Sequence, residues 1–251
     1  MNALVLNDSK FAYNYCKILS LFGINADVRN RPISPQNYDF LLLCGGGDVN
    51  PAFYSNAQYP CNNIDTERDV IELSLIEKFA RQGKEIIGIC RGLQVLNVYF
   101  GGTLENIPFA PNCNLNGIPK TDLSGDSENK SAAINADLRG DFSINYPLKD
   151  LNFGVFHSQI DGKDSKHEVY TSPKFCDKFN KTIIVNSAHK QRIKRLADSF
   201  TPVFVAADGT IEGIASKTLP IVAFQFHPER MLENFSLSGK ELFSFALNYN
   251  P

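Results

Sequence analysis

The stretch EIIGICRGLQVLNVYF, residues 85–100, decides the fold of this chain. Its opening residues, Glu85 to Ile89, form a short apolar run that is typical of a buried strand, and Leu93 to Phe100 has the pattern of a helix. Cys90 lies between them, with a glycine two positions away on each side that lets the backbone pass close. The stretch therefore predicts a strand, a sharp turn and a helix, with a thiol at the apex of the turn.

A turn of this kind has two interpretations. It lifts a nucleophile out of the sheet and points the N-terminus of the next helix at it, and the positive end of the helix dipole favours the thiolate over the thiol. A cysteine in an apolar junction between strand and helix is also common as an inert core residue. The turn alone leaves both interpretations open.

A second motif lies far downstream, where the apolar run 221–226 leads into His227, Pro228 and Glu229. Side chains at positions i and i+2 of an extended chain point the same way, and the proline between them restricts the backbone. Glu229 can therefore bond one imidazole nitrogen of His227 while the other faces a thiol, as in a Cys-His-Glu triad. Without the Cys90 turn, the same motif indicates only a histidine at a strand end, paired with a surface glutamate.

A third motif follows the apolar run from Asp39 to Cys44, which ends in three glycines, Gly45 to Gly47. Backbone without side chains can turn its N–H groups toward a developing negative charge, as an oxyanion hole requires. A glycine run after a strand is usually only a turn, so this motif gains its meaning from the other two.

In this order, the three motifs resemble the class I glutamine amidotransferase family. Within it, the chain resembles the stand-alone γ-glutamyl hydrolases of the peptidase C26 type, a branch that includes γ-glutamyl-γ-aminobutyrate hydrolase. The further motifs that carry this resemblance are Asp48 to Pro51 with Tyr54; Asp65, Arg68, Asp69 and Glu72; Cys90 to Gln94; Gly101 to Leu104; His167 to Val169; Val185 to Ser187 with His189 and Gln191; Asp208, Gly209, Ile211 and Glu212; and Gln225.

The resemblance implies hydrolysis of a γ-glutamyl amide through a γ-glutamyl thioester, which releases glutamate and an amine and uses no cofactor. It implies that Cys90 is the nucleophile, that His227 is the acid and base, and that Glu229 fixes the imidazole tautomer. It also implies an oxyanion site and a binding site for the glutamyl group. The residues that it assigns to these sites are Gly46, Gly47 and Arg91 for the oxyanion, and Gln94, Asn186, Ser187 and His189 for the substrate.

The chain departs from the family at Lys190, where the branch often has a second histidine. Lys190 and Arg192 form a basic cluster with Lys194 and Arg195, directly after His189. If this cluster faces the site, Lys190 and Arg192 bind substrate, and the leaving group is anionic, such as a carboxylate or a nucleotide phosphoramidate. A solvated helix face explains the same run of charges.

Two further functions stay open at this point. The chain could be the glutaminase subunit of a two-component amidotransferase, which would hydrolyse free glutamine and pass ammonia to a separate synthetase. It could also be a non-catalytic binding module on the same fold, although the intact Cys90, His227 and Glu229 argue against that.

Composition narrows the class of partner. The formal net charge is −2, and charges of both signs are spread along the chain, so we expect a small-molecule γ-glutamyl substrate and no nucleic acid. We find no export signal and no apolar run of membrane length, so we expect a cytoplasmic protein without a membrane partner. The six cysteines have irregular spacing typical of free thiols, and the four histidines lack metal-ligand spacing, so we expect no metal. Oligomeric state is open, with a homodimer as one option.

The order of apolar runs predicts an α/β fold: a mostly parallel central sheet flanked by helices, flavodoxin-like, with a small antiparallel portion. The predicted strands are 3–6, 24–29, 40–44, 85–89, 182–185, 203–207, 211–215 and 221–226, and the predicted helices occupy parts of 11–22, 65–83, 93–100 and 238–247. The second helix is expected to bury a stripe made of Val70, Leu73, Ile76, Phe79 and Ala80. We expect one domain, 1–251, in which the polar segment 106–166 is a long insertion that forms either a lid or a surface excursion.

Overall fold

The computed structural model describes residues 1–31, 33–55, 61, 63–107, 155, 157–159, 162–232, 235 and 237–251. Most of the insertion expected at 106–166 lies outside these residues. The lid and the single-domain organisation therefore stay predictions.

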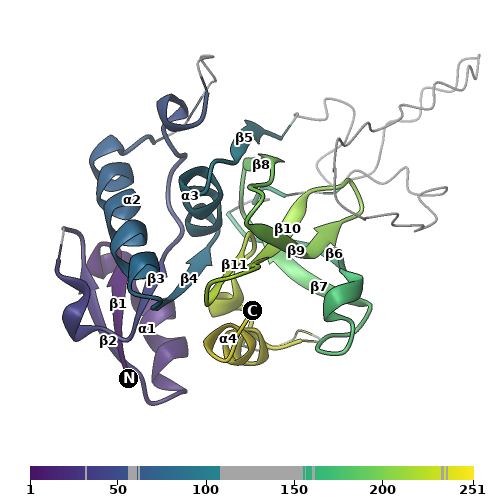
Figure 1. The fold of residues 1–251 in the computed structure, drawn as a ribbon. Helices are drawn as coiled ribbons and strands as arrows, with labels where there is room; N and C mark the ends of the chain where they lie inside the picture. The colour runs from purple at the N-terminus through teal and green to yellow at the C-terminus, as the bar shows by residue number, and fades with distance from the viewer. Residues whose placement is uncertain are drawn as a thin grey trace, which may run out of the picture. The chain divides into compact units, whose positions relative to one another are not determined.

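A nine-stranded sheet forms the centre of the described part (Figure 1). Five strands pair in parallel, in the order β2 (Asn25–Arg29), β1 (Asn2–Leu6), β3 (Phe40–Leu43), β4 (Glu85–Ile89) and β11 (Ile221–Phe224). The sheet continues with antiparallel pairs through β10 (Ile211–Ser216), β9 (Phe200–Ala206), β6 (Ser165–Thr171) and β7 (Thr182–Ser187). A separate antiparallel pair joins β5 (Thr103–Asn106) to β8 (Gln191–Arg195).

The α/β class and the helix-flanked sheet are confirmed, but the antiparallel part is larger than the small portion expected. Strands β5, β6 and β8 were not predicted, because they lack an apolar run. In β6, for example, charged and polar side chains alternate with the buried positions Ser165, Val169 and Thr171. The turn expected at Gly209 does join β9 to β10, with φ of 83° at the glycine.

Helices cover both faces of the parallel half. The core on one face combines α1 (Tyr13–Ser20) and α4 (Gly239–Leu247), and the core on the other combines α2 (Thr66–Arg81) and α3 (Arg91–Tyr99). Single 3-10 turns occupy Ser9–Phe11, Pro35–Asn37, Pro51–Phe53, Pro173–Phe175 and Pro228–Arg230. None of the helices described is both long and apolar enough to cross a membrane.

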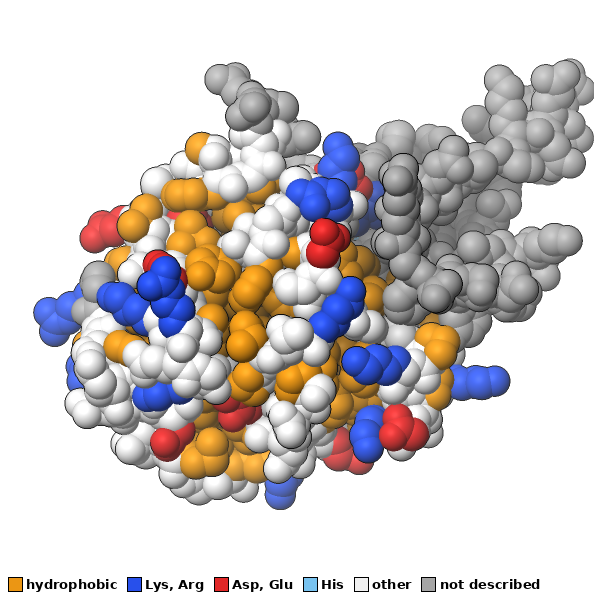
Figure 2. Space-filling model, viewed as in Figure 1, with side chains coloured by type: hydrophobic (Ala, Val, Ile, Leu, Met, Phe, Trp, Pro, Cys, Tyr) orange, Lys and Arg blue, Asp and Glu red, His pale blue; other side chains and the backbone are white. Residues whose placement is uncertain are grey.

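The two cores are separated by the alternation of side chains along each strand. In β1, Ala3 and Val5 belong to the core with α1 and α4, whereas Leu4 and Leu6 belong to the core with α2 and α3. Because both faces are covered, a parallel strand such as β3, sequence FLLL, is apolar throughout and fully buried. On the face drawn in Figure 2, acidic and basic side chains are interspersed and no histidine is visible.

The stripe expected on α2 is wrong in part. Ile76 and Phe79 are buried, but Val70 is 54% exposed, and two acidic residues, Asp69 and Glu72, take buried positions instead. The apolar pattern failed here because these acids are paired with a buried arginine, which the pattern of one helix cannot reveal.

That arginine is Arg91, the first residue of α3. Its guanidinium forms ion pairs with Asp69 and Glu72 of α2, and all three side chains are almost completely buried. Glu72 also pairs with Nε of Arg68 at 2.8 Å, and Arg68 donates to the carbonyl oxygens of Cys44 and Gly45 at 3.0 and 3.2 Å. This buried charge network therefore fastens α3 and the glycine run to α2.

Breaking the network should cost far more than breaking an exposed pair on the same helix. We expect Glu72→Gln to lower the free energy of unfolding by roughly 3–5 kcal/mol, because it removes one of the two carboxylates paired with the buried Arg91 and also the carboxylate paired with Arg68. The matched control is Glu77→Gln, whose exposed pair with Arg81 should contribute less than about 1 kcal/mol. Urea unfolding of both variants measures the difference, and equal losses would contradict the role given to the network.

Candidate functional site

Cys90 is the residue at which the chain turns from β4 into α3. Its φ is 54° and its ψ is −104°, a region that non-glycine residues rarely adopt and that is often associated with functional sites. Its N–H donates to the carbonyl oxygen of Phe224 in β11 at 2.7 Å, and the residue is 6% exposed. The sharp turn with a thiol at its apex is confirmed.

The glycines on either side let α3 pack directly against the sheet. A side-chain carbon added to Gly92 would lie 2.4 Å from the carbonyl oxygen of Leu43. One added to Gly88 would lie 2.8 Å from the carbonyl carbon of Gly92. Both distances are too short for a side chain, so the close approach requires glycine at both positions.

His227 and Glu229 meet directly after β11, at the 3-10 turn Pro228–Arg230. Nδ1 of His227 lies 2.8 Å from Oε1 of Glu229, and both side chains are buried. The same carboxylate oxygen lies 3.3 Å from Nε of Arg230. The backbone N–H of His227 donates to Oδ1 of Asn186 at 2.9 Å, and the Asn186 amide donates back to the His227 carbonyl at 3.1 Å. The imidazole and its backbone are therefore fixed by direct bonds to Glu229 and Asn186.

The charge state of His227 follows from its neighbours. Burial alone would lower the pKa of the imidazole, but the charges of Glu229 and Cys90, and hydrogen bonds to both side chains, raise the pKa to about 10. His227 is therefore protonated at neutral pH and lies beside the Cys90 sulfur. This places a proton donor next to the thiol.

The glycine run after β3 borders the same site. A side-chain carbon added to Gly45 would lie 3.1 Å from Cε1 of His227 and 3.6 Å from Cβ of Cys90. The N–H of Gly45 donates to the hydroxyl oxygen of Tyr15 at 3.0 Å. Gly46 lies close to the side chains of Arg68 and Arg91. A side-chain carbon added to Gly46 would lie 2.5 Å from Nη1 of Arg68 and 3.1 Å from Cδ of Arg91. The expected oxyanion group of Gly46, Gly47 and Arg91 stays a prediction.

Several residues expected to bind substrate share backbone partners: Gln94 and His189 contact the Gln191 carbonyl, and Ser187 and His189 contact the His157 carbonyl. Gln94 donates to the Gln191 carbonyl and to Oε1 of Gln225, at 3.1 and 3.2 Å, and Asn186 holds His227 as described above. The Ser187 hydroxyl donates to the carbonyl of His157 at 2.9 Å. His189 also belongs to a cluster of histidines, described below. The structure thus shows protein contacts for these side chains, and their contact with substrate stays a prediction.

The basic cluster is not a helix face, as the second interpretation of the sequence assumed, because Gln191–Arg195 forms strand β8. Arg192 pairs with Glu105 of β5 at 2.9 Å and lies 3.7 Å from Asp208, whereas Lys190 is exposed. Arg195 donates to the carbonyl of Gly101. Arg192 is thus held by Glu105 and Asp208, and Arg195 by the Gly101 carbonyl.

Three residues at the site carried no functional prediction. Tyr15 was expected only as an apolar position of α1, yet its hydroxyl contacts the glycine run, and burial raises its pKa well above the ordinary value. Gln225 lies with Nε2 3.8 Å from the Cys90 sulfur, and Arg230 forms an ion pair with Asp164 at 3.0 Å. The motif that contains Gln225 was part of the family resemblance, but nothing in the sequence pattern indicated the other two contacts.

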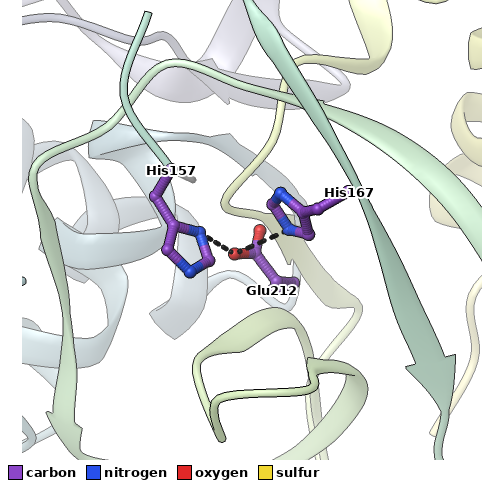
Figure 3. Close-up of side chains that lie close together, drawn as sticks. All are labelled: His157, His167 and Glu212. Atoms are coloured by element: carbon purple, nitrogen blue, oxygen red, sulfur yellow. Dashed lines mark ion pairs between the residues drawn. The ribbon is translucent and has the colours of Figure 1, made fainter. Parts of the chain in front are cut away.

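A second polar cluster surrounds Glu212 of β10. His157, His167 and His189 place ring nitrogens 3.1, 3.4 and 3.3 Å from its Oε1, and Figure 3 shows the rings of His157 and His167 on either side of the carboxylate. Burial alone would raise the pKa of Glu212, but the histidines hold it well below its ordinary value. Burial alone would lower the pKa of His157, but bonds to Asp208 and Glu212 raise it to about 9, while burial lowers the pKa of His189.

Comparison with known proteins places the chain in a family. The family model of peptidase C26 matches residues 27–229. This chain belongs to the peptidase C26 family. "Putative glutamine amidotransferase PB2B2.05" of Schizosaccharomyces pombe is 30% identical over 218 residues, which are 85% of this chain and 70% of that protein. Protein NtpR of Enterococcus hirae is 29% identical over 214 residues, 82% of this chain and 73% of NtpR.

Among solved structures, a putative GMP synthase subunit of Thermoplasma acidophilum superimposes with a TM-score of 0.59. The match covers 98% of this chain and 92% of that one, at 20% identity, a level that shows the fold alone. The family and its curated relatives make this chain an amide-hydrolysing enzyme of the glutamine amidotransferase type. The structural match shows that it has the class I fold. The finer resemblance to γ-glutamyl-γ-aminobutyrate hydrolase stays a prediction.

The charge state of His227 can be tested by NMR titration of labelled histidines. We expect the His227 imidazole to stay protonated through neutral pH and to lose its proton only near pH 10. In Cys90→Ser this pKa should fall, because the interactions with the Cys90 side chain that raise it are gone, and Cys176→Ser, which removes an exposed thiol, should leave it unchanged. A His227 signal that titrates near its ordinary pKa of about 6.5 in the wild type would contradict this account.

Proposed function

We propose that the protein hydrolyses a γ-glutamyl amide, with Cys90 as nucleophile, His227 as acid and base, and Glu229 as the orienting carboxylate. The observation that carries this proposal is the arrangement at one edge of the sheet. A thiol lies at a strained turn and at a helix N-terminus, beside an imidazole whose far nitrogen is bound to a buried carboxylate.

In the first half of the reaction, the Cys90 thiolate attacks the γ-carbonyl carbon and forms a C–S bond. The oxyanion that results lies near the N–H of Arg91, which as the first residue of α3 has no partner within the helix. Gly46 and Gly47 supply the second donor in this proposal. His227 then gives its proton to the leaving nitrogen, the C–N bond breaks, and the amine departs from a γ-glutamyl thioester.

In the second half, a water molecule takes the place of the amine. His227, now neutral, accepts a proton from the water, whose oxygen attacks the thioester carbonyl. The C–S bond breaks, glutamate leaves, and Cys90 returns to the thiolate beside a protonated imidazole. Glu229 keeps the proton-transferring nitrogen pointed at the reacting atoms throughout, and Asn186 contributes by holding the His227 backbone.

A second function differs only in its substrate. The likeness to a GMP synthase component supports, at the level of the fold, a glutaminase that hydrolyses free glutamine and passes ammonia to a separate synthetase. Its Cys90 chemistry would be the same. Glutamine, assayed with and without a partner, therefore belongs in any substrate test.

The decisive assay measures glutamate release from glutamine, γ-glutamyl-γ-aminobutyrate, γ-glutamyl peptides, γ-glutamyl polyamines and phosphate-bearing γ-glutamyl amides. We expect turnover of at least one conjugate, and we expect Cys90→Ala to lower it by about 10⁴-fold or more, as in other triads. Cys176→Ser is the matched thiol control and should retain full activity. Substantial hydrolysis by Cys90→Ala would exclude the proposed nucleophile, and turnover of glutamine alone would favour the glutaminase.

The same panel tests the leaving group. If the basic cluster receives an anionic amine, Lys190→Ala should raise KM several-fold for a phosphate-bearing or carboxylate-bearing conjugate and leave KM for a neutral conjugate unchanged. Lys194→Ala, in the adjacent strand β8, is the control for a general loss of positive charge. If Lys190→Ala leaves KM for the anionic conjugate at the wild-type value, or changes KM for both conjugates by the same factor, the anionic substrate is excluded.

A further inference from the structure

The proposed reaction uses one of the four histidines of the chain, and the other three gather around Glu212. All four side chains of this group, which we call the histidine cluster, are 7% exposed or less. Among the described residues, no well-aligned hydrogen bond reaches Nδ1 of His157, either nitrogen of His167, Nε2 of His189 or either oxygen of Glu212, and the close contacts between them are the ion-pair distances to Oε1 of Glu212. Buried polar atoms without a well-aligned hydrogen bond are costly, so the cluster requires an explanation.

The outward-facing nitrogens of two histidines are held by acceptors. Nε2 of His157 lies 3.0 Å from Oδ2 of Asp208, and Nδ1 of His189 lies 2.9 Å from the carbonyl oxygen of Gln191. A histidine that binds a metal through one nitrogen almost always donates its other N–H to a carboxylate or a backbone carbonyl. Both rings have this arrangement, with the second nitrogen directed at Glu212.

The bond from His189 to Gln191 also fixes a tautomer. A carbonyl oxygen can only accept, so Nδ1 of His189 carries a hydrogen, and in the neutral form of the ring Nε2 presents a lone pair to the Glu212 carboxylate. Two acceptors that face one another at 3.3 Å repel, unless a proton or a cation lies between them. The remaining question is which of the two the site is built for.

The spacing of the atoms favours a cation. In a tetrahedral zinc site with bonds of about 2.0–2.2 Å, neighbouring ligand atoms are separated by about 3.4 Å. The three nitrogens of the cluster lie 3.1, 3.4 and 3.3 Å from Oε1 of Glu212, and the ligand atoms of His157, His167 and Glu212 all lie within 4.8 Å of one another. The rings on either side of the carboxylate in Figure 3 are thus close to the positions that a shared ion requires.

We propose that Nδ1 of His157, Nε2 of His167 and one oxygen of Glu212 bind a divalent transition-metal ion of the zinc type. Imidazole nitrogen with carboxylate oxygen is a donor set that such ions prefer, and the three protein ligands lie in a buried place. The ion joins β6, β10 and the 157–159 segment. The expectation of no metal rested on spacing along the sequence, which does not apply to ligands that come from three separate segments.

Metal content of the full-length protein tests the proposal. The protein is stripped with a chelator, loaded with Zn²⁺, freed of excess metal by gel filtration and analysed by mass spectrometry. We expect about one Zn²⁺ per chain in the wild type and less than about a tenth as much in His167→Asn and in Glu212→Gln. The matched control is His227→Ala, which removes the one histidine outside the cluster and should retain the ion.

A further variant tests whether the acceptor that holds His157 contributes to Zn²⁺ affinity. Asp208→Asn weakens the acceptor on its outer nitrogen and should lower Zn²⁺ affinity by about 10–100-fold without abolishing binding. Because exposed thiols such as Cys176 attract zinc, surface binding would appear equally in the wild type and in His167→Asn. Zn²⁺ content near zero in the wild type, or unchanged in both cluster variants, overturns the proposal.

A measurement on the wild type alone guards against variants that fail to fold. Saturating Zn²⁺ should raise Tm of the stripped protein by about 5 °C or more, and a chelator should reverse the change. His227→Ala should show the same rise. An unchanged Tm overturns a structural site, and because neither metal content nor Tm depends on turnover, these results stand apart from the test of γ-glutamyl hydrolysis.

Discussion

The positive φ of Cys90 is the constraint on which the described structure depends. A non-glycine residue in this region costs on the order of 1–3 kcal/mol, so it persists only where its surroundings determine it. Here the N–H of Cys90 is bonded to Phe224, two glycines let α3 pack directly on the sheet, and the next residue, Arg91, is held between Asp69 and Glu72. The strain falls on the one residue whose sulfur must leave the plane of the sheet.

The parallel half of the sheet explains why the site can form at all. Strands β3, β4 and β11 are neighbours, and their carboxyl ends meet at one edge. The glycine run follows β3, Cys90 follows β4, and His227 follows β11. Each element of the site thus leaves a different strand at the same level, which is the usual place for a binding site in an open parallel sheet. The Arg68 bonds to the Cys44 and Gly45 carbonyls then fix the glycine run beside the thiol.

The antiparallel half of the sheet supports the site through hydrogen bonds and side-chain contacts, whereas the parallel half supplies the strands that end there. The N–H of Gln225 donates to the Glu212 carbonyl at 2.9 Å, and its side chain lies 3.8 Å from the Cys90 sulfur. Asn186 is bonded to the backbone of His227, whereas its neighbour Ser187 is bonded to the carbonyl of His157. The histidine cluster and the proposed catalytic residues are therefore linked through Gln225 and through the Asn186–Ser187 pair.

The sequence by itself determined the parallel half, the turn at Cys90 and the meeting of His227 with Glu229, because these depend on short apolar runs, glycine spacing and neighbours two residues apart. It did not determine the buried face of α2, strands β5, β6 and β8, or the position of Tyr15. Nor did it determine the histidine cluster, whose members come from residues 157, 167, 189 and 212. Only the tertiary structure decided these. A buried polar side chain is stabilised by a partner that lies far away in the sequence, and a local sequence pattern cannot show which residue that partner is.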